Sequence, residues 1–177
     1  MTLQDLAFSV ETNCSCNERP IVLRALRDAA RDFCKRSECY VAVSTFDNEP
    51  EQDLYDGAGS REGINVYRVL DVEYLVNGNA VPLREEEYEL AGTNLVRVKR
   101  PHENVHSIRI KAVLSPDPGS ENLPEDLVTR YYDALVYGAC MRIVRQAGTP
   151  YFSPELEMSF HQLYLRELTK AIVDSEN

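Results

Sequence analysis

Residues 123–146 carry the most regular hydrophobic pattern in the chain. Apolar side chains recur there at steps of three and four residues, which is the period of an α-helix and not of a strand. Two such rows share Leu135, so the apolar surface is wide and the helix is expected to be buried on more than one side. The pattern predicts the central helix of a packed bundle.

Four residues of this central helix are predicted to make helix–helix contacts. Gly138 lacks a side chain in the middle of the helix, where glycine costs about 1 kcal/mol relative to alanine. We therefore expect close approach of another helix at this position. The predicted packing residues are Tyr131, Leu135, Gly138 and Ala139.

Two further helices are predicted from apolar rows that face charged or polar rows. The first spans about residues 17–36, with Pro20 in its first turn, where proline is tolerated. The second spans about residues 153–173, with Ser153 as a candidate N-cap. The loop before this last helix is short, which predicts that it lies antiparallel to the central helix. Residues 1–19 fit either a short helical turn or an extended arm.

Between the helices predicted at residues 17–36 and 123–146, the pattern changes to the alternation of half-buried strands. Residues 39–115 contain several such runs, and the glycine-rich stretch 56–63 is predicted to be a loop. Asn77-Gly78 follows a β-branched run and predicts a two-residue hairpin turn. The expected fold class is α+β. One N-terminal and two C-terminal helices form a small bundle, and an antiparallel sheet or sandwich of five or six strands is inserted in it, all in a single domain over residues 1–177.

Composition and charge narrow the class of protein. The chain has 177 residues, 44% of them hydrophobic, which is enough for a real core. No window has the pattern of a signal peptide or a membrane span, so we expect a soluble protein made in a cytoplasm. The net charge of −10 argues against a general nucleic-acid binder, because phosphate contacts require clustered lysine and arginine.

Candidate chemistry is sparse. The five cysteines follow no disulfide or zinc framework. Cys14 and Cys16, together with His102 and His106, have side chains that zinc accepts, but their spacing matches no common zinc site. Paired carboxylates could come from the acidic residues Asp53, Asp56, Glu85, Glu86 and Glu87. Dispersed acids of this kind usually keep a surface soluble, so we expect no enzyme, no cofactor and no metal.

Several short blocks, in order along the chain, resemble a known family. They are Ala-Leu-Arg-Asp-Ala-Ala-Arg-Asp-Phe-Cys at 25–34, Ala-Val-Leu-Ser-Pro at 112–116, Leu-Pro-Glu at 123–125, Tyr-Asp-Ala-Leu at 132–135, Gly138-Ala139, Gly-Thr-Pro-Tyr at 148–151 and Ser153-Pro154. Over about residues 20–170 they resemble the head-to-tail adaptor (connector) proteins of tailed bacteriophages. Those proteins have the same order of helix, β insertion and two helices.

The resemblance implies a structural role in the virion neck. Such adaptors form a ring of about twelve copies between the portal of the head and the next neck or tail component. Genomic DNA passes through the bore without sequence-specific binding, including during ejection, and an acidic wall would let it pass without adhering. No membrane is involved.

The resemblance also implies that the last helix docks on the portal. The predicted portal-facing residues are Leu165, Leu168, Ile172 and Val173. A competing interpretation places Leu168 and Ile172 in the core of the bundle, and periodicity alone does not separate the two.

Two other functions remain open at this stage. One is a different neck or tail-completion protein, which predicts a different ring partner and fewer helices. The other is a small metal-binding or hydrolytic protein that uses cysteine and histidine.

Overall fold

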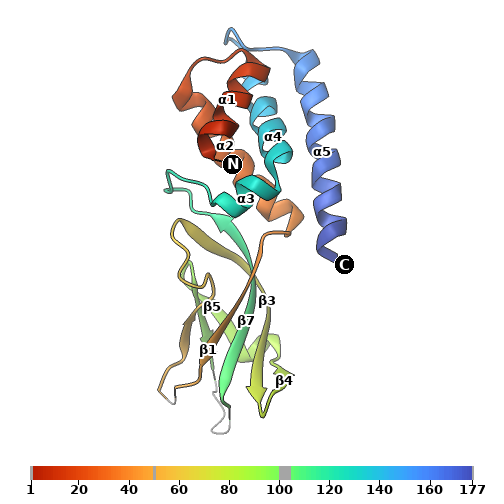
Figure 1. The fold of residues 1–177 in the computed structure, drawn as a ribbon. Helices are drawn as coiled ribbons and strands as arrows, with labels where there is room; N and C mark the ends of the chain where they lie inside the picture. The colour runs from red at the N-terminus through yellow and green to blue at the C-terminus, as the bar shows by residue number, and fades with distance from the viewer. Residues whose placement is uncertain (1, 50, 100–104, 177) are drawn as a thin grey trace. The chain divides into compact units, whose positions relative to one another are not determined.

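The computed structural model describes residues 2–49, 51–99 and 105–176. The chain divides into two compact units (Figure 1). The helical unit consists of Met1–Cys39 and Pro116–Asn177, and the β unit consists of Tyr40–Ser115. The α+β class predicted from the sequence is confirmed, with helices in one unit and antiparallel strands in the other.

The helical unit is built around α4, which packs against α1, α2 and α5 (Figure 1). Its helices are α1 (Leu3–Cys14), α2 (Arg19–Ser37), α3 (Glu125–Arg130), α4 (Tyr132–Val144) and α5 (Pro154–Glu176). Pro20 lies in the first turn of α2, as expected. Most residues of α4 are buried because neighbouring helices cover it on several sides.

The N-terminal segment is a full helix, which the sequence left undecided. Thr2 caps α1 by accepting a hydrogen bond from the Asp5 amide, and the Asp5 carboxylate accepts one from the Thr2 amide. This reciprocal capping satisfies two amides that would otherwise lack partners. Leu6, Val10 and Cys14 then bury one side of α1 in the bundle.

The central helix predicted over residues 123–146 is interrupted, so that prediction is corrected. The chain leaves helical geometry at Tyr131, with φ −122° and ψ 31°, and this residue separates α3 from α4. No proline or glycine lies at the break. The cause is tertiary, because the Tyr131 ring packs at 5.0 Å from the Phe33 ring and its hydroxyl donates to Cys39 O.

The β unit holds two antiparallel sheets. The first has the strand order β1-β7-β3-β4, and the second has the order β2-β6-β5. The strands are β1 (Val41–Asp47), β2 (Leu54–Asp56), β3 (Ile64–Val76), β4 (Asn79–Pro82), β5 (Tyr88–Ala91), β6 (Leu95–Val98) and β7 (Ser107–Pro116). A single turn of 3₁₀-helix, Glu85–Glu87, precedes β5.

The hairpin predicted at Asn77-Gly78 is present between β3 and β4. Both residues have positive φ, at 51° and 82°, and Val76 pairs with Asn79 across the turn. The two sheets share a core, where the Phe46 ring of β1 lies 5.6 Å from the Tyr55 ring of β2. Across the described parts of the chain, no helix is both long enough and apolar enough to cross a membrane.

Candidate functional site

The four predicted packing residues all belong to the interior or the edge of the helical unit. Leu135 and Ala139 are fully buried, and Tyr131 is half-buried. Gly138 is buried where α4 meets both α2 and α5. A Cβ atom at Gly138 would lie 3.1 Å from the Ala29 Cβ of α2. Ala29 and Gly138 together bring two helices closer than larger side chains would allow.

A polar network fixes α5 to α2 and α4 beside this contact. The buried Tyr164 hydroxyl donates a 2.7 Å hydrogen bond to Asp32 Oδ2. The same carboxylate oxygen lies 3.2 Å from Arg142 Nη2 and 3.5 Å from Arg36 Nη1. Arg142 also donates to Gly138 O at 2.8 Å. Burial, and secondly the hydrogen bond to Asp32, raises the pKa of Tyr164 well above its ordinary value.

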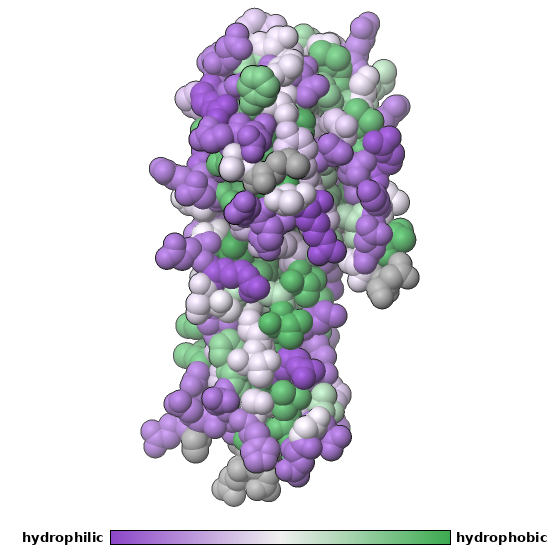
Figure 2. Space-filling view, in the orientation of Figure 1, coloured by the Kyte–Doolittle hydropathy of each residue, from purple (hydrophilic) through white to green (hydrophobic). Residues whose placement is uncertain are grey.

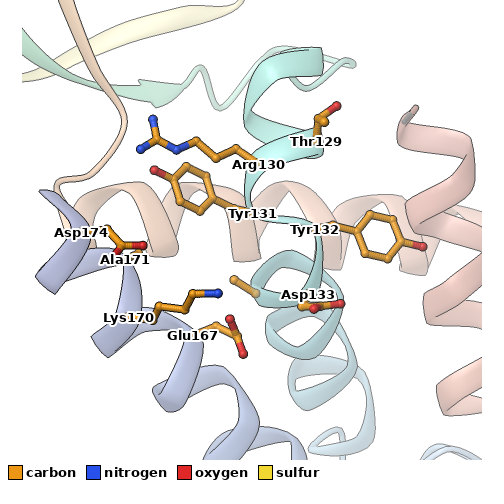
Figure 3. A pocket seen from close by; sticks show the side chains of 10 residues that line it. Thr129, Arg130, Tyr131, Tyr132, Asp133, Glu167, Lys170, Ala171 and Asp174 are labelled. Carbon is orange, nitrogen blue, oxygen red and sulfur yellow. The ribbon is translucent and has the colours of Figure 1, made fainter.

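A pocket lies between the α3–α4 junction and the C-terminal part of α5 (Figure 3), and no sequence pattern predicted it. Its volume is about 230 Å³. It is lined by Thr129, Arg130, Tyr131, Tyr132, Asp133, Ala134, Glu167, Lys170, Ala171 and Asp174. The Tyr132 side chain extends away from α5 (Figure 3), and its hydroxyl is hydrogen-bonded to Ser9 of α1. Charges of both signs line the pocket.

The predicted portal-facing residues of α5 do not share one environment. Leu168 is buried in the bundle, with 5% of its surface exposed, so the structure favours the core interpretation for this residue. Ile172 is half-buried. Leu165 and Val173 are exposed, by 37% and 52%. Of the four predicted residues, Leu165, Ile172 and Val173 can therefore contact a partner without unpacking α5, whereas Leu168 cannot.

Other apolar side chains are exposed on the helical unit. Phe8 of α1 is 69% exposed and Met158 of α5 is 66% exposed. Figure 2 shows a largely hydrophilic face on which apolar side chains form separate spots. No exposed role was predicted for Phe8; the signal that could have shown it is its position outside the helical row of Leu6 and Val10.

The candidate zinc ligands do not assemble in the described residues. Cys14 and Cys16 are both buried free thiols. His106 lies in the β unit, and its Nε2 is 3.3 Å from Asn77 Oδ1. His102 lies outside the described residues. Among the residues with described positions, no group of three or more histidine, cysteine or acidic side chains could hold a metal ion.

The candidate carboxylates have local structural partners in the β unit. Asp56 accepts hydrogen bonds from the amides of Ala58 and Ser60, at 3.0 Å and 2.6 Å, and so fixes the glycine-rich loop. Asp53 pairs with Arg97 at 3.3 Å. Glu87 accepts a 2.8 Å hydrogen bond from the Arg84 amide. These contacts account for the three carboxylates as parts of loops and strand pairs.

No protein-family model and no curated protein matches the sequence. Among solved structures, a similar chain is described as "Neck of empty GTA particle computed with C6 symmetry". The match covers 89% of this chain and 87% of that chain, with 12% sequence identity and a TM-score of 0.34. A TM-score this low describes a partial likeness, which supports no statement about the function of this chain.

Proposed function

We propose that this chain is a structural subunit of the neck of a tailed bacteriophage. Copies of it form a ring, of about twelve members, between the portal and the next neck or tail component. The proposal assigns the chain no catalytic activity, cofactor or metal. Its location is the virion, and its role is to join head to tail around a passage for DNA.

One observation carries this proposal. Two of the blocks that resemble the head-to-tail adaptors, residues 25–34 and Gly138-Ala139, are about a hundred residues apart in the sequence. They pack directly on each other, because Ala29 faces Gly138 at the closest approach of α2 and α4. The resemblance therefore concerns residues that share one core, and such residues determine how the helices are arranged.

The charge of the chain supports the passage of DNA without adhesion. The net charge is −10, and residues 116–177 carry ten acidic and five basic side chains. Residues 1–39 carry six of each. An acidic wall repels the phosphate backbone, so duplex DNA slides through it without binding. We propose that acidic side chains outnumber basic ones on the inner wall of the ring.

Portal contact is proposed for the C-terminal part of α5. Leu165, Ile172 and Val173 present apolar surface there, whereas Leu168 is withdrawn into the bundle. Apolar side chains on an exposed helix are a typical core for a protein–protein contact surrounded by polar residues.

Electron microscopy tests the proposal directly. Purified protein is expected to form rings in negative stain, and gold-labelled antibody is expected to mark the neck of intact particles. The purified protein is also expected to bind DNA-filled heads that contain the portal, with heads lacking the portal as the control. Equal binding to both kinds of head, or labelling away from the neck, contradicts the proposal.

A further inference from the structure

One side of α5 carries a row of uncharged residues that its own helical unit leaves open. This row, here called the α5 seam, consists of Met158, Gln162, Leu165, Thr169 and Ile172. Steps of four, three, four and three residues place the five in one line, as in the seam of a coiled coil. Met158 is 66% and Leu165 is 37% exposed, and Gln162 and Thr169 are exposed as well. The α5 seam therefore has the pattern of a helix-packing surface.

A matching surface lies on α1. Gln4, Phe8 and Thr12 follow one another at steps of four residues and are uncharged, and the outermost of them is Phe8, at 69% exposure. Leu6 and Val10 point into the bundle, so Phe8 points away from it. A phenylalanine held on a capped helix offers a rigid apolar knob for a neighbouring groove.

The two surfaces face in different directions. Tyr132 and Cys140 of α4 contact α1, through the Ser9 hydroxyl and the Cys14 thiol. Tyr137 and Gly138 of α4 contact α5 instead, and the Tyr137 ring stacks on Phe160 at 6.4 Å. These two pairs lie on roughly opposite sides of a helix with 3.6 residues per turn. α1 and the α5 seam thus cannot meet within one copy, but they can meet between successive copies.

Charges beside the two surfaces are complementary. α1 contains Asp5 and Glu11 and no lysine or arginine. Glu11 is paired with Arg19 of α2 at 2.7 Å, and Arg19 also donates to Gln4. Asp5 is therefore the acidic side chain of α1 with no ion pair to a described residue of its own copy.

Arg166 and Lys170 lie beside the α5 seam. Arg166 pairs with Glu167 at 3.0 Å, and its side chain is still 66% exposed. Complementary charges at the rim of an interface fix its register and favour one orientation over others.

We infer that α1 of one copy packs along the α5 seam of the next copy, with Phe8 between Met158 and Leu165. Asp5 of α1 then lies near Arg166 and Lys170. α1 has 12 residues, and at about 1.5 Å per residue its length matches the Met158–Thr169 part of the seam. This contact is heterologous, so repeating it closes a ring when the rotation between copies allows. The inference rests on the proposed function, since it supplies the contact between subunits of that ring. It assigns Leu165 to the neighbouring copy instead of to the portal, and leaves Ile172, at the C-terminal end of the seam, and Val173 for the portal.

Cysteine cross-linking tests the contact. A chain with both Phe8→Cys and Leu165→Cys, treated with a mild thiol oxidant, is expected to form a ladder of covalent oligomers on a non-reducing gel. A mixture of the Phe8→Cys chain and the Leu165→Cys chain is expected to give covalent dimers and nothing larger, because each chain then has one reactive surface. The five native cysteines are buried in the described structure and leave this readout clear.

The matched control pairs Phe8→Cys with Leu156→Cys, which is 43% exposed on another side of α5. The control chain is expected to form no ladder. In a separate measurement, Phe8→Glu is expected to raise the dissociation constant for self-association about tenfold or more. The protein is expected to stay folded, because Phe8 is exposed.

The outcomes separate this inference from the proposed function. Rings in the microscope without cross-links above the control overturn the α1–α5 contact and leave the proposed function standing. Cross-linked ladders from a protein that never binds portal-containing heads support the contact and contradict the function. A chain that neither cross-links nor assembles overturns the inference.

Discussion

Tyr164 lies directly against Gly138, so that a Cβ atom on Gly138 would stand 3.0 Å from Tyr164 Cε2. Ala29 closes the same space from α2, with its Cβ at 3.1 Å from that position. Three helices therefore meet where one of them has no side chain, and this point sets the spacing of the helical unit.

Gly138→Leu is expected to lower the free energy of unfolding by about 1–3 kcal/mol, because the larger side chain overpacks the contact with α2 and α5. Urea denaturation of the purified variant measures this. Ser159→Leu is the control, since Ser159 is exposed on α5 and has room for the added atoms. An unchanged midpoint for Gly138→Leu means that the helices can separate without cost at this contact.

Tyr164→Phe is expected to lower the free energy of unfolding by about 1–2 kcal/mol, because it removes a buried hydrogen bond. The lost bond is the one that the Tyr164 hydroxyl donates to the Asp32 carboxylate. The same carboxylate forms ion pairs with Arg142 and Arg36. Tyr137→Phe serves as the control, because its ring keeps the stacking on Phe160 while its hydroxyl has no hydrogen-bond partner among the described residues. Equal stability of the two variants would show that the Asp32 network does not depend on the hydroxyl.

The raised pKa of Tyr164 also predicts alkaline sensitivity. In the unfolded chain a tyrosine loses its proton near pH 10, whereas burial and the Asp32 contact hold the proton in the folded state to a higher pH. The stability due to this difference is complete below about pH 10 and is lost as the pH rises further. Urea denaturation at a series of pH values measures this. Above about pH 10, the free energy of unfolding is expected to fall less steeply with pH for Tyr164→Phe than for the natural chain.

Thiol accessibility gives a prediction for all five cysteines, each of them buried. Burial raises the pKa of the Cys34 thiol, and hydrogen bonding to Cys14 together with burial raises the pKa of Cys140. Both effects reduce the reactive thiolate. A chromogenic disulfide reagent at pH 8 is expected to react slowly with the thiols of the native protein. In denaturant the same reagent is expected to react quickly with all five thiols. Rapid reaction of several thiols in the native protein contradicts the described packing.

Duplex DNA is expected to bind the protein weakly or not at all. The acidic excess repels the backbone, and few clustered cations are present to release counterions. A gel-shift series from low to physiological salt measures this, with a basic DNA-binding protein as the positive control. Tight binding that falls steeply with salt would contradict the proposed acidic bore.

A C-terminal truncation tests the proposed portal contact. Deleting residues 169–177 would remove Ala171, which is only 4% exposed, and so would disturb the bundle itself. Deleting residues 173–177 keeps Ala171 and Ile172 and is expected to leave a folded subunit. This shorter protein is expected to bind portal-containing heads more weakly. Full binding by a folded truncated subunit excludes a role for the last turn, and loss of the thermal transition shows that this turn is needed for folding.

The sequence predicts the elements of this fold better than their interruptions. Helix α2 and the Asn77-Gly78 hairpin depend on local signals, namely an apolar row and a turn that favours positive φ. The break at Tyr131 has no local signal, because it follows from contacts with Phe33 and Cys39 that only the folded chain provides. α1 did have a signal in the spacing of Thr2 and Asp5, but the apolar Phe8 obscured the helical period.

Surface roles were harder to predict than burial. The row through Leu165, Leu168 and Ile172 is apolar throughout, and a helical period does not state how much of an apolar surface its own unit covers. The structure draws that boundary between Leu168, which is buried, and Leu165, which is exposed. The α5 seam became recognisable only when exposure was added to spacing.

The β unit begins and ends on neighbouring strands. The Leu114 amide donates a 2.7 Å hydrogen bond to Tyr40 O, and the pairing continues through Val41 and Val113. Because the two ends of this insertion adjoin each other, a short turn can replace it without separating the helices on either side. The β unit could therefore be shortened or lengthened without moving apart the two points at which the chain leaves and re-enters the helical unit.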